Sequence, residues 1–203
     1  LVAHEGKIIY KNGFGWANME WKIPNKPDTK FRIASVTKQF TAMLILQLVA
    51  DGKLDLYKPI STYLPNYPKE QGNKVNIHQL LTHSSGTPNN YESDPKLNKF
   101  PDKHRLENLV KAFSDLPLEF NPGERFSYSN SGYVVLGYII EKVTGKSYET
   151  VLEEKILDPL NMKNTEIEKH RPITMNRANG YFESFGEYYN ANYIDMSSVY
   201  TAG

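Results

Sequence analysis

Ser35 and Lys38, three residues apart, are the most informative pair in this chain. They lie in the stretch Phe31–Ala42, where an irregular sequence changes into an apolar pattern with helical spacing. A serine at a helix start lies near backbone N–H groups that attract negative charge, and a residue three positions later shares its face. A lysine amine kept neutral could then accept the serine proton, which would give an activated nucleophile without a histidine.

The Ser-x-x-Lys pattern alone is weak evidence, because about one match is expected by chance in a chain of this length. A second match runs from Ser93 to Lys96, but Pro95 inside it disfavours a helical face. Ser35 could also be a simple N-cap, which is the commonest role of a serine at a helix start. The catalytic interpretation therefore depends on the rest of the sequence.

A second candidate group, Tyr128-Ser129-Asn130, lies in an extended stretch just before an apolar helix. A tyrosine beside a cationic lysine loses its proton more readily, because the positive charge stabilises the phenolate. Tyr128 could then act as a general base or acid, and the Asn130 amide could bind a substrate carbonyl and Lys38. The alternative is a loop tyrosine with a turn asparagine, since Tyr-x-Asn occurs twice more in the chain.

Composition limits the other classes of function. The chain has 203 residues, of which 39% are hydrophobic, and this suits one large domain or two small subdomains. A net charge of +1 with dispersed charges gives no reason to expect a nucleic-acid partner. There is no cysteine, so a disulfide framework and a thiolate nucleophile are excluded. His78 and His83 are five residues apart, which places them on different helix faces, and we expect no metal or other cofactor.

The order of the predicted elements, strands first and then helices, indicates an α+β fold. Two strand-like runs on either side of His4-Glu5-Gly6 predict an N-terminal hairpin, which needs further strands as sheet partners. No element is predicted within 170–203. Apolar spacing and cap residues predict helices over 36–50, 76–83, 106–116, 133–143 and 147–157, with a helical turn in 54–64.

Three motifs, in this order, resemble the serine β-lactamase and penicillin-binding-protein superfamily. They are Ser35–Ala42, Gln79–Gly86 and Pro122–Tyr133, and further fits occur at Leu54–Ile60, Ile156–Met162 and Thr201–Gly203. The chain is most similar to the class C β-lactamases with their esterase and D-peptidase relatives. The separation of Ser35 and Tyr128, 128 − 35 = 93 residues, suits that branch, and the resemblance covers essentially the whole chain.

The resemblance implies a role for each matched residue. Ser35 would be the acylated nucleophile, Lys38 would accept its proton or tune Tyr128, and Tyr128 would be the base for acylation and for activating water. Asn130 would orient the substrate amide and Lys38. The backbone N–H of Ser35 would supply half of the oxyanion hole, and residues 79–86 would support the site without taking part in the chemistry.

The implied architecture is β-lactamase-like, with an antiparallel sheet flanked by helices beside an all-helical subdomain. Within one partial domain over 1–203, residues 1–35 would supply strands of the α/β subdomain and 36–203 the mostly helical one. The family's third motif, Lys/His-Thr/Ser-Gly on an inner strand, is absent from these residues. We therefore expect a chain that is incomplete at its C-terminus and that alone cannot complete the second half of the oxyanion hole.

These expectations predict a serine hydrolase that forms an acyl-enzyme on an amide or ester. A β-lactam, a D-amino-acid peptide and a small ester are all compatible with the shared motifs. The alternative is a non-catalytic or single-turnover penicillin-binding sensor on the same scaffold, which would keep the nucleophile. The expected partner is a small-molecule or peptide substrate, and membrane association and oligomeric state stay open. Family usage implies a periplasmic or extracellular bacterial setting, although the chain contains no visible signal peptide.

Overall fold

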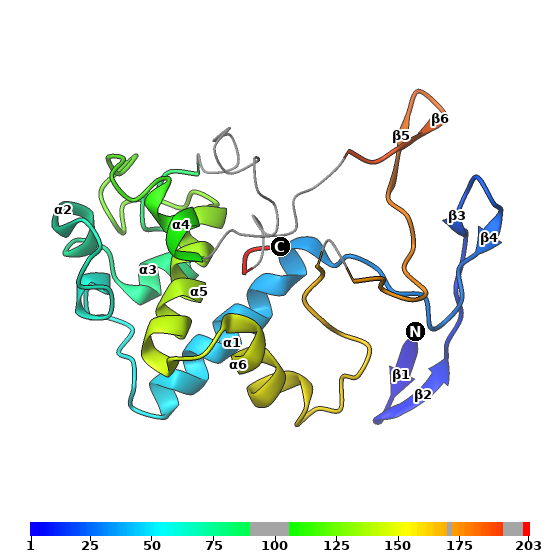
Figure 1. The fold of residues 1–203 in the computed structure, drawn as a ribbon, viewed down its shortest axis with the longest axis horizontal. Coiled ribbons are helices and arrows are strands. Elements are labelled where there is room, and N and C mark those ends of the chain that lie inside the picture. The colour runs from blue at the N-terminus through cyan, green and yellow to red at the C-terminus, as the bar shows by residue number, and fades with distance from the viewer. Residues whose placement is uncertain (90–105, 170–171, 193–200) are drawn as a thin grey trace. The chain divides into compact units, whose positions relative to one another are not determined.

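The computed structural model describes residues 1–89, 106–169, 172–192 and 201–203. The chain divides into two compact units. The first unit comprises residues 1–32 and 171–194, and the second comprises 33–170 and 195–203. The strands belong to the first unit and the helices to the second, as Figure 1 shows by label. This separation of strands from helices confirms the predicted α+β class.

The first unit contains three two-stranded antiparallel sheets in its described residues, with β1 paired to β2, β3 to β4 and β5 to β6. Glu5 and Gly6 form the turn of the predicted N-terminal hairpin, with positive φ angles of 49° and 73°. The strands are β1 (Val2–His4), β2 (Lys7–Tyr10), β3 (Trp16–Asn18), β4 (Ile23–Pro24), β5 (Tyr181–Ser184) and β6 (Glu187–Asn190).

The hairpin of β5 and β6 lies in a part of the sequence where no element was expected. Its turn is Phe185-Gly186, and both residues have positive φ, 52° and 82°. Backbone bonds join this stretch to the N-terminal one, for example Lys30 N–H to Asn176 O at 2.8 Å. The division into 1–35 and 36–203 stays a prediction of the domain organisation, while contacts group 171–194 with the N-terminal strands.

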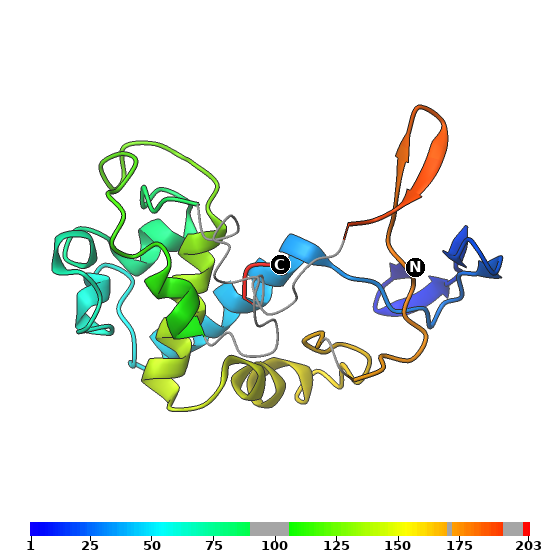
Figure 2. The ribbon, with the colours of Figure 1, turned by 45° about the horizontal axis from the view of Figure 1, so that its top comes forward.

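The second unit is helical in its described residues, and Figure 2 gives a second view of its helices. Helix α5 packs against α1, α3, α4 and α6. The predicted helices are observed, with α4 ending earlier than expected, α5 beginning earlier, at Asn130, and the last one divided into α6 and η5. The elements are η1 (Ala34–Val36), α1 (Thr37–Ala50), η2 (Ile60–Thr62), α2 (Lys69–Gly72), α3 (Ile77–Leu81), α4 (Leu106–Lys111), α5 (Asn130–Thr144), α6 (Tyr148–Leu152) and η5 (Glu153–Leu157), which is a π-helical turn.

Local sequence explains where several of these helices begin and end. Helix α3 starts with a capping box, in which the Asn76 side chain accepts from Gln79 N–H and the Gln79 side chain accepts from Asn76 N–H. Ser147 caps α6 by accepting from Thr150 N–H at 3.2 Å, as the sequence predicts. Helix α5 ends at Gly145, whose φ of 68° is the left-handed geometry common at helix C-termini.

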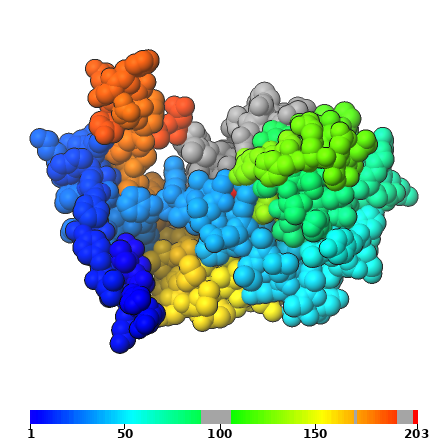
Figure 3. All heavy atoms as spheres, turned by 180° about the vertical axis from the view of Figure 1, so that it is seen from behind, coloured from blue at the N-terminus to red at the C-terminus, as the bar shows by residue number. Residues whose placement is uncertain are grey.

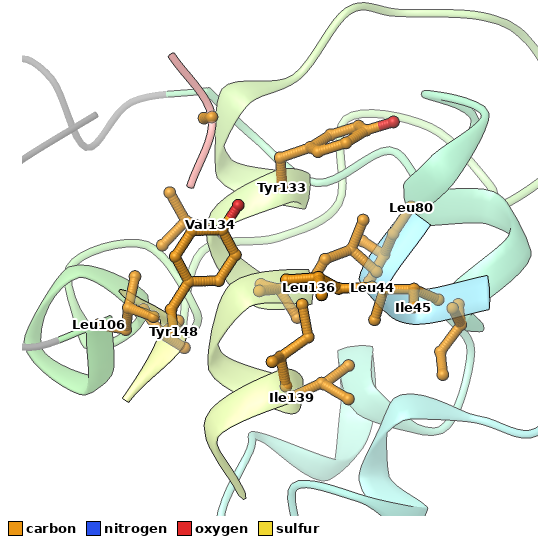
Figure 4. Close-up of a cluster of buried hydrophobic side chains, with 14 of the residues drawn as sticks. Leu44, Ile45, Leu80, Leu106, Tyr133, Val134, Leu136, Ile139 and Tyr148 are labelled. Atoms are coloured by element: carbon orange, nitrogen blue, oxygen red, sulfur yellow. The ribbon is translucent and has the colours of Figure 1, made fainter. Parts of the chain in front are cut away.

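The hydrophobic core lies around α5. Figure 4 shows side chains from α1, α3, α4 and α6 gathered about this helix, among them Leu44, Leu80, Leu106 and Tyr148. Leu136 and Ile139 of α5 are completely buried there. From behind, the light-blue atoms of α1 lie between the yellow atoms of α6 and η5 and the cyan atoms that follow α1 (Figure 3). The core therefore fixes α1 and α5 relative to each other.

None of the helices in the described parts of the chain combines the length and the apolar character needed to cross a membrane.

Candidate active site

Ser35 lies in the short turn η1, directly before α1. The preceding residue, Ala34, has a φ of 45°, a left-handed conformation that costs a non-glycine residue about 1 kcal/mol or more. Neither η1 nor α1 has a side-chain cap at its N-terminus, so the interpretation of Ser35 as a simple N-cap is wrong. Its hydroxyl instead meets two catalytic candidates, Tyr128 and Lys38.

The ammonium group of Lys38 is surrounded by three oxygen atoms. Its Nζ lies 2.7 Å from Asn130 Oδ1, 2.5 Å from the Ala202 carbonyl oxygen and 3.2 Å from Ser35 Oγ. The residue is only 7% exposed, which is unusual for lysine and requires such partners. Figure 1 shows the red C-terminal residues beside the start of α1, where this contact is made.

The three partners of Lys38 are not equivalent in their ability to exchange a proton. An amide oxygen and a backbone carbonyl only accept hydrogen bonds, so Asn130 and Ala202 engage two N–H groups of Lys38 in either protonation state. The third direction points to Ser35 Oγ, a hydroxyl that can accept from an ammonium or donate to an amine. The geometry therefore directs the exchangeable position of the lysine toward the candidate nucleophile.

Tyr128 contacts both members of the Ser35–Lys38 pair. Its hydroxyl donates to Ser35 Oγ at 2.7 Å, and Lys38 Nζ lies 4.7 Å from the centroid of its ring. The cation lies over a ring face, which attracts positive charge. Tyr128 is 45% exposed, so its hydroxyl lies where an incoming molecule can reach it.

Two other tyrosines near this group are held in their neutral form. Burial, and then the charge on Tyr128, raises the pKa of Tyr133, whose hydroxyl donates to the Leu81 carbonyl at 3.1 Å. Burial raises the pKa of Tyr148 to about 12. Tyr128 is therefore the tyrosine placed to exchange a proton with Ser35.

The start of α5 positions Asn130. The Ser129 hydroxyl accepts from Gly132 N–H at 3.1 Å and acts as the N-cap. The side-chain oxygen of Asn89 accepts from the N–H groups of Asn130 and Ser131, at 2.9 and 3.2 Å. Three of the N–H groups that a helix start leaves without backbone partners are thus satisfied, and the backbone of Asn130 is held in place.

The segment Thr201–Gly203 reaches Lys38 through a buried set of hydrogen bonds. The hydroxyl of Thr41, three residues after Lys38 in α1, donates to the Thr201 carbonyl at 2.8 Å and lies 2.7 Å from the Tyr148 hydroxyl. The Thr201 hydroxyl donates to the Tyr133 carbonyl at 3.0 Å. These bonds fix the Ala202 carbonyl on Lys38.

The structure brings together all four residues singled out from the sequence, Ser35, Lys38, Tyr128 and Asn130. Their catalytic roles stay a prediction. The second Ser-x-x-Lys match, Ser93–Lys96, lies outside the described residues. No group of three or more His, Cys, Asp or Glu side chains within the described ranges is arranged to hold a metal ion.

Sequence reasoning missed three contacts of the site. The sequence indicates no role for the Ala202 carbonyl or the Asn89 side-chain oxygen, and for His83 it indicates only structural support. The fit of Thr201-Ala202-Gly203 to the family is the one signal in the sequence for the first of these contacts. A main-chain carbonyl has no signature in sequence, and a single asparagine next to a polar stretch has none either.

Comparisons with known proteins identify the relatives of this chain. The model of the family described as Beta-lactamase matches residues 1–201. Protein flp from Staphylococcus aureus strain MW2 is 35% identical over 185 residues, which cover 89% of this chain and 36% of that protein. The penicillin binding protein from Bacillus halodurans has a TM-score of 0.75 and 34% identity, covering 89% of this chain and 58% of that one.

An enzyme structure is also similar. The D-amino acid amidase from Ochrobactrum anthropi SV3, solved with L-phenylalanine amide, has a TM-score of 0.79 and 32% identity, covering 93% of this chain and 55% of that one. The chain thus spans between about a third and just over half of the length of these relatives.

Proposed function

The chain belongs to the Beta-lactamase family, and from this premise we propose that it carries the nucleophile and general base of a serine hydrolase. The enzyme would act on an amide or an ester through an acyl-enzyme. Ser35 is the nucleophile, Lys38 and Tyr128 share the role of base, and Asn130 binds the substrate amide. The observation that carries this proposal is the convergence on Ser35 Oγ of the Tyr128 hydroxyl at 2.7 Å and the Lys38 amine at 3.2 Å.

Two protonation arrangements of this group contain the same number of protons. In one, Lys38 is an amine that accepts the Ser35 proton while the phenol of Tyr128 donates to Ser35. In the other, Lys38 is an ammonium and Tyr128 a phenolate that accepts the Ser35 proton, a form that the nearby cation stabilises. Either arrangement removes the proton as Ser35 Oγ forms its bond to the substrate carbonyl carbon.

The acylation step then follows from the geometry. The tetrahedral intermediate carries its negative charge on the former carbonyl oxygen, and the Ser35 N–H at the start of η1 and α1 is the expected donor to it. The proton held by Tyr128 or Lys38 passes to the leaving amine or alcohol as its bond to carbon breaks, and the acyl group stays on Ser35. Water deprotonated by Tyr128 attacks this ester, which releases the acid and restores the hydroxyl.

Asn130 supports both partners of the reaction. Its Oδ1 is committed to Lys38 at 2.7 Å, so the opposite, Nδ2 end of the amide is the one that would bind a substrate carbonyl. The likeness to a D-amino acid amidase favours an amide substrate, and a β-lactam, a D-amino-acid peptide or a small ester all present the required carbonyl. The penicillin-binding relatives favour a bacterial, extracytoplasmic setting.

Labelling of the full-length protein by a fluorescent penicillin and by a fluorophosphonate tests the proposal. Ser35→Ala should abolish labelling, and Tyr128→Phe, which keeps the ring, should slow it by about 10²–10⁴-fold. Ser93→Ala is the matched control, because it removes the serine of the second Ser-x-x-Lys match, and it should label like the wild type. The idea fails if the wild type neither labels nor hydrolyses an ester or amide, with Ser35→Ala making no difference.

The same experiment separates a hydrolase from a sensor. A hydrolase releases product repeatedly from p-nitrophenyl esters or D-amino acid amides, whereas a single-turnover sensor stops after one equivalent. Repeated turnover would support the hydrolase, and a stable acyl-enzyme after one equivalent would assign the chain to the sensor class.

A further inference from the structure

His83 contacts the residues on both sides of Tyr128. Its carbonyl oxygen accepts from Ser127 N–H at 2.8 Å, and its Nδ1 accepts from Ser129 N–H at 3.1 Å. One residue thus binds the backbone immediately before and immediately after Tyr128. The chemistry described above makes no use of this histidine, although it lies next to the base.

The imidazole ring also packs on Tyr128 itself. The two ring centroids are 4.6 Å apart and the planes tilt by 31°. The centroid of the imidazole also lies 5.1 Å from the centroid of the Tyr133 ring and 5.7 Å from that of the Phe126 ring. Lys38 Nζ lies over the rings of both Tyr128 and Tyr133, at 4.7 and 5.4 Å from their centroids. His83 is therefore part of the aromatic packing that supports the base beside its lysine.

The backbone of His83 also adopts an uncommon conformation. Its φ is 55°, which non-glycine residues adopt rarely and asparagine more readily than most. His83 lies two residues after the end of α3 at Leu81, and the capping box at the start of α3 fixes this helix. A well-anchored helix thus leads into the residue that contacts both neighbours of Tyr128.

The hydrogen bond from Ser129 requires neutral His83. Only a neutral imidazole has a lone pair on Nδ1, so its proton must be on Nε2. Burial, and then the charge of Lys38, lowers the pKa of His83 from its ordinary value of 6.5. The neutral ring is therefore the stable form at neutral pH, and a proton on Nδ1 would face the Ser129 N–H.

We propose that His83 is a positioning residue for Tyr128, holding the phenol hydroxyl on Ser35 through the Ser127 and Ser129 contacts and the stacked ring. The proposal rests on the proposed function, since it assigns His83 to the base of that reaction. It also makes the site sensitive to acid. Protonation of the imidazole breaks the Ser129 contact and adds a second cation beside Lys38, and both effects displace the base.

The direction of this pH dependence follows from the groups around the ring. Among the described residues, the titratable groups that contact or electrostatically affect His83 are Lys38 from α1, Tyr128, and Tyr133 from α5. The pKa of His83 lies below 6.5, so the contact is intact above that value. Acylation should fall as the pH decreases through the lowered pKa.

Two variants of full-length protein separate the contacts of His83. His83→Asn keeps an oxygen near the position of Nδ1 and tolerates the positive φ, but it loses the ring and the titration. His83→Phe keeps a ring but loses the acceptor. We expect labelling by the fluorophosphonate to slow by about 10–100-fold in His83→Phe, because small displacements of a reacting group are costly, and less in His83→Asn. The decrease below pH 6.5 should disappear in both.

His78→Asn is the matched control. His78 lies on α3 and its ring stacks on the exposed Tyr57 at 5.5 Å, so this variant should keep the wild-type rate and pH profile. Wild-type rates in both His83 variants, with the decrease below pH 6.5 still present, would overturn the proposal. Failure of the proposed function is a different result, namely a wild type that does not label at any pH.

A measurement without turnover keeps the test independent of folding defects and of activity. In the Ser35→Ala protein, NMR titration of the imidazole should give a midpoint below 6.5, and the Tyr128 ring resonances should shift with the same midpoint. Tyr128 resonances that do not respond to the His83 titration would contradict the coupling, whatever the labelling experiments give.

Discussion

The two units of this chain differ most in what they bury. The second unit encloses a continuous apolar core around α5, with Leu136 and Ile139 fully buried. The first unit has no buried side chain in its described residues, and it leaves Trp21 80% exposed and Phe185 fully exposed. Both units contain strongly apolar sequence, so hydrophobic composition alone does not determine burial. A two-stranded hairpin offers no second layer against which apolar residues can pack.

This difference determines where a precise site can be built. All the described residues of the candidate site, including His83 and Ala202, belong to the second unit. Their helices are fixed by a close-packed core, which has low compressibility. A catalytic group needs this rigidity, because a displacement of about 1 Å can cost 10²-fold in rate.

The largest expected effect comes from shortening one isoleucine in each unit. Ile139→Ala removes a completely buried side chain from α5 and should lower the free energy of unfolding by about 2–5 kcal/mol. In a protein of these 203 residues, Ile9→Ala removes a side chain that is 64% exposed on β2, and it should change that free energy by less than about 0.5 kcal/mol. Urea unfolding of both variants gives the comparison. Equal losses would show that the face of β2 is covered in the folded protein, and the contrast between the units would not hold.

A smaller effect is expected from two glycines of α5. A Cβ at Gly137 would lie 2.8 Å from the Thr201 Cβ and Oγ1, so Gly137→Ala must displace the segment that carries the Ala202 carbonyl. We expect a stability loss of about 1–3 kcal/mol and slower acylation of Ser35. Thermal unfolding and fluorophosphonate labelling measure the two effects.

Gly132→Ala is the control for this change in the same helix. Its added Cβ would lie 3.5 Å from the nearest side-chain atom, in Leu80, which is ordinary van der Waals contact. Alanine is preferred over glycine inside a helix by roughly 0.5–1 kcal/mol, so this variant should be at least as stable as the wild type. If both glycine variants lost the same stability, crowding at Thr201 would not be the cause.

The Asn89 side chain contributes to the cap of α5, and its removal should lower stability less than the changes above while still slowing acylation. Asn89→Ala removes the acceptor for Asn130 N–H and Ser131 N–H and should cost about 0.5–2 kcal/mol, with slower acylation. Asn89→Asp keeps an acceptor and adds a charge that suits a helix N-terminus, so it should restore stability. Ser147→Ala removes the cap of α6. It should cost a similar amount of stability without changing acylation, and a loss of acylation there would argue against a specific role for the cap at α5.

The smallest expected effect concerns the pKa values of two glutamates, one in each unit, which shift in opposite directions. In the first unit, the Tyr181 hydroxyl lowers the pKa of Glu20, which is exposed to solvent. In the second, burial raises the pKa of Glu141, which accepts from Tyr148 N–H at 2.9 Å. NMR titration should therefore place the two carboxyl groups on opposite sides of 4.5.

The signs for stability are also opposite. Glu20 contributes stability that is present above its ordinary pKa and is lost as the pH falls through the lowered one. Glu141 binds its proton more tightly in the folded state, so its contribution falls as the pH rises above 4.5. Glu141→Gln keeps an acceptor for Tyr148 and should change stability at neutral pH by less than about 1 kcal/mol, in the stabilising direction. A clear loss would mean that the charged form is favoured.

The sequence predicts an element correctly where apolar spacing and cap residues indicate the same boundaries. Helices α5 and α6 have apolar spacing together with a cap serine or a terminal glycine, and both are observed. The β5–β6 hairpin was missed because its turn places Phe185 where a positive φ is expected of asparagine, aspartate or glycine. Where turn residues and backbone conformation disagree, as at Phe185, the element cannot be predicted from the sequence.

The same reasoning applies to the site. Ser35 and Lys38 are neighbours on one helical turn, so their contact follows from spacing alone. The setting of Tyr128 and Asn130 before an apolar helix makes them candidates, and the resemblance raises them above the other Tyr-x-Asn matches, since nothing local brings them to Lys38. Asn89 contributes one side-chain oxygen. Its polar neighbours carry many similar oxygen atoms, so the sequence does not indicate which of them caps α5. The β-lactamase-like fold and family were predicted correctly, whereas the role of each site residue remains to be tested.

The sequence distances around Lys38 have a consequence for how the protein is made. Its partners Asn130 and Ala202 lie 92 and 164 residues further along the chain, and contacts between such distant residues slow folding because long loops must close. On the ribosome, α1 is complete long before either partner has been synthesised. Lys38 therefore has its full set of partners only after nearly all of these residues have been made, and in a shorter nascent chain its amine lacks the Ala202 carbonyl. Folding itself is thus the step that assembles the group of side chains around Lys38.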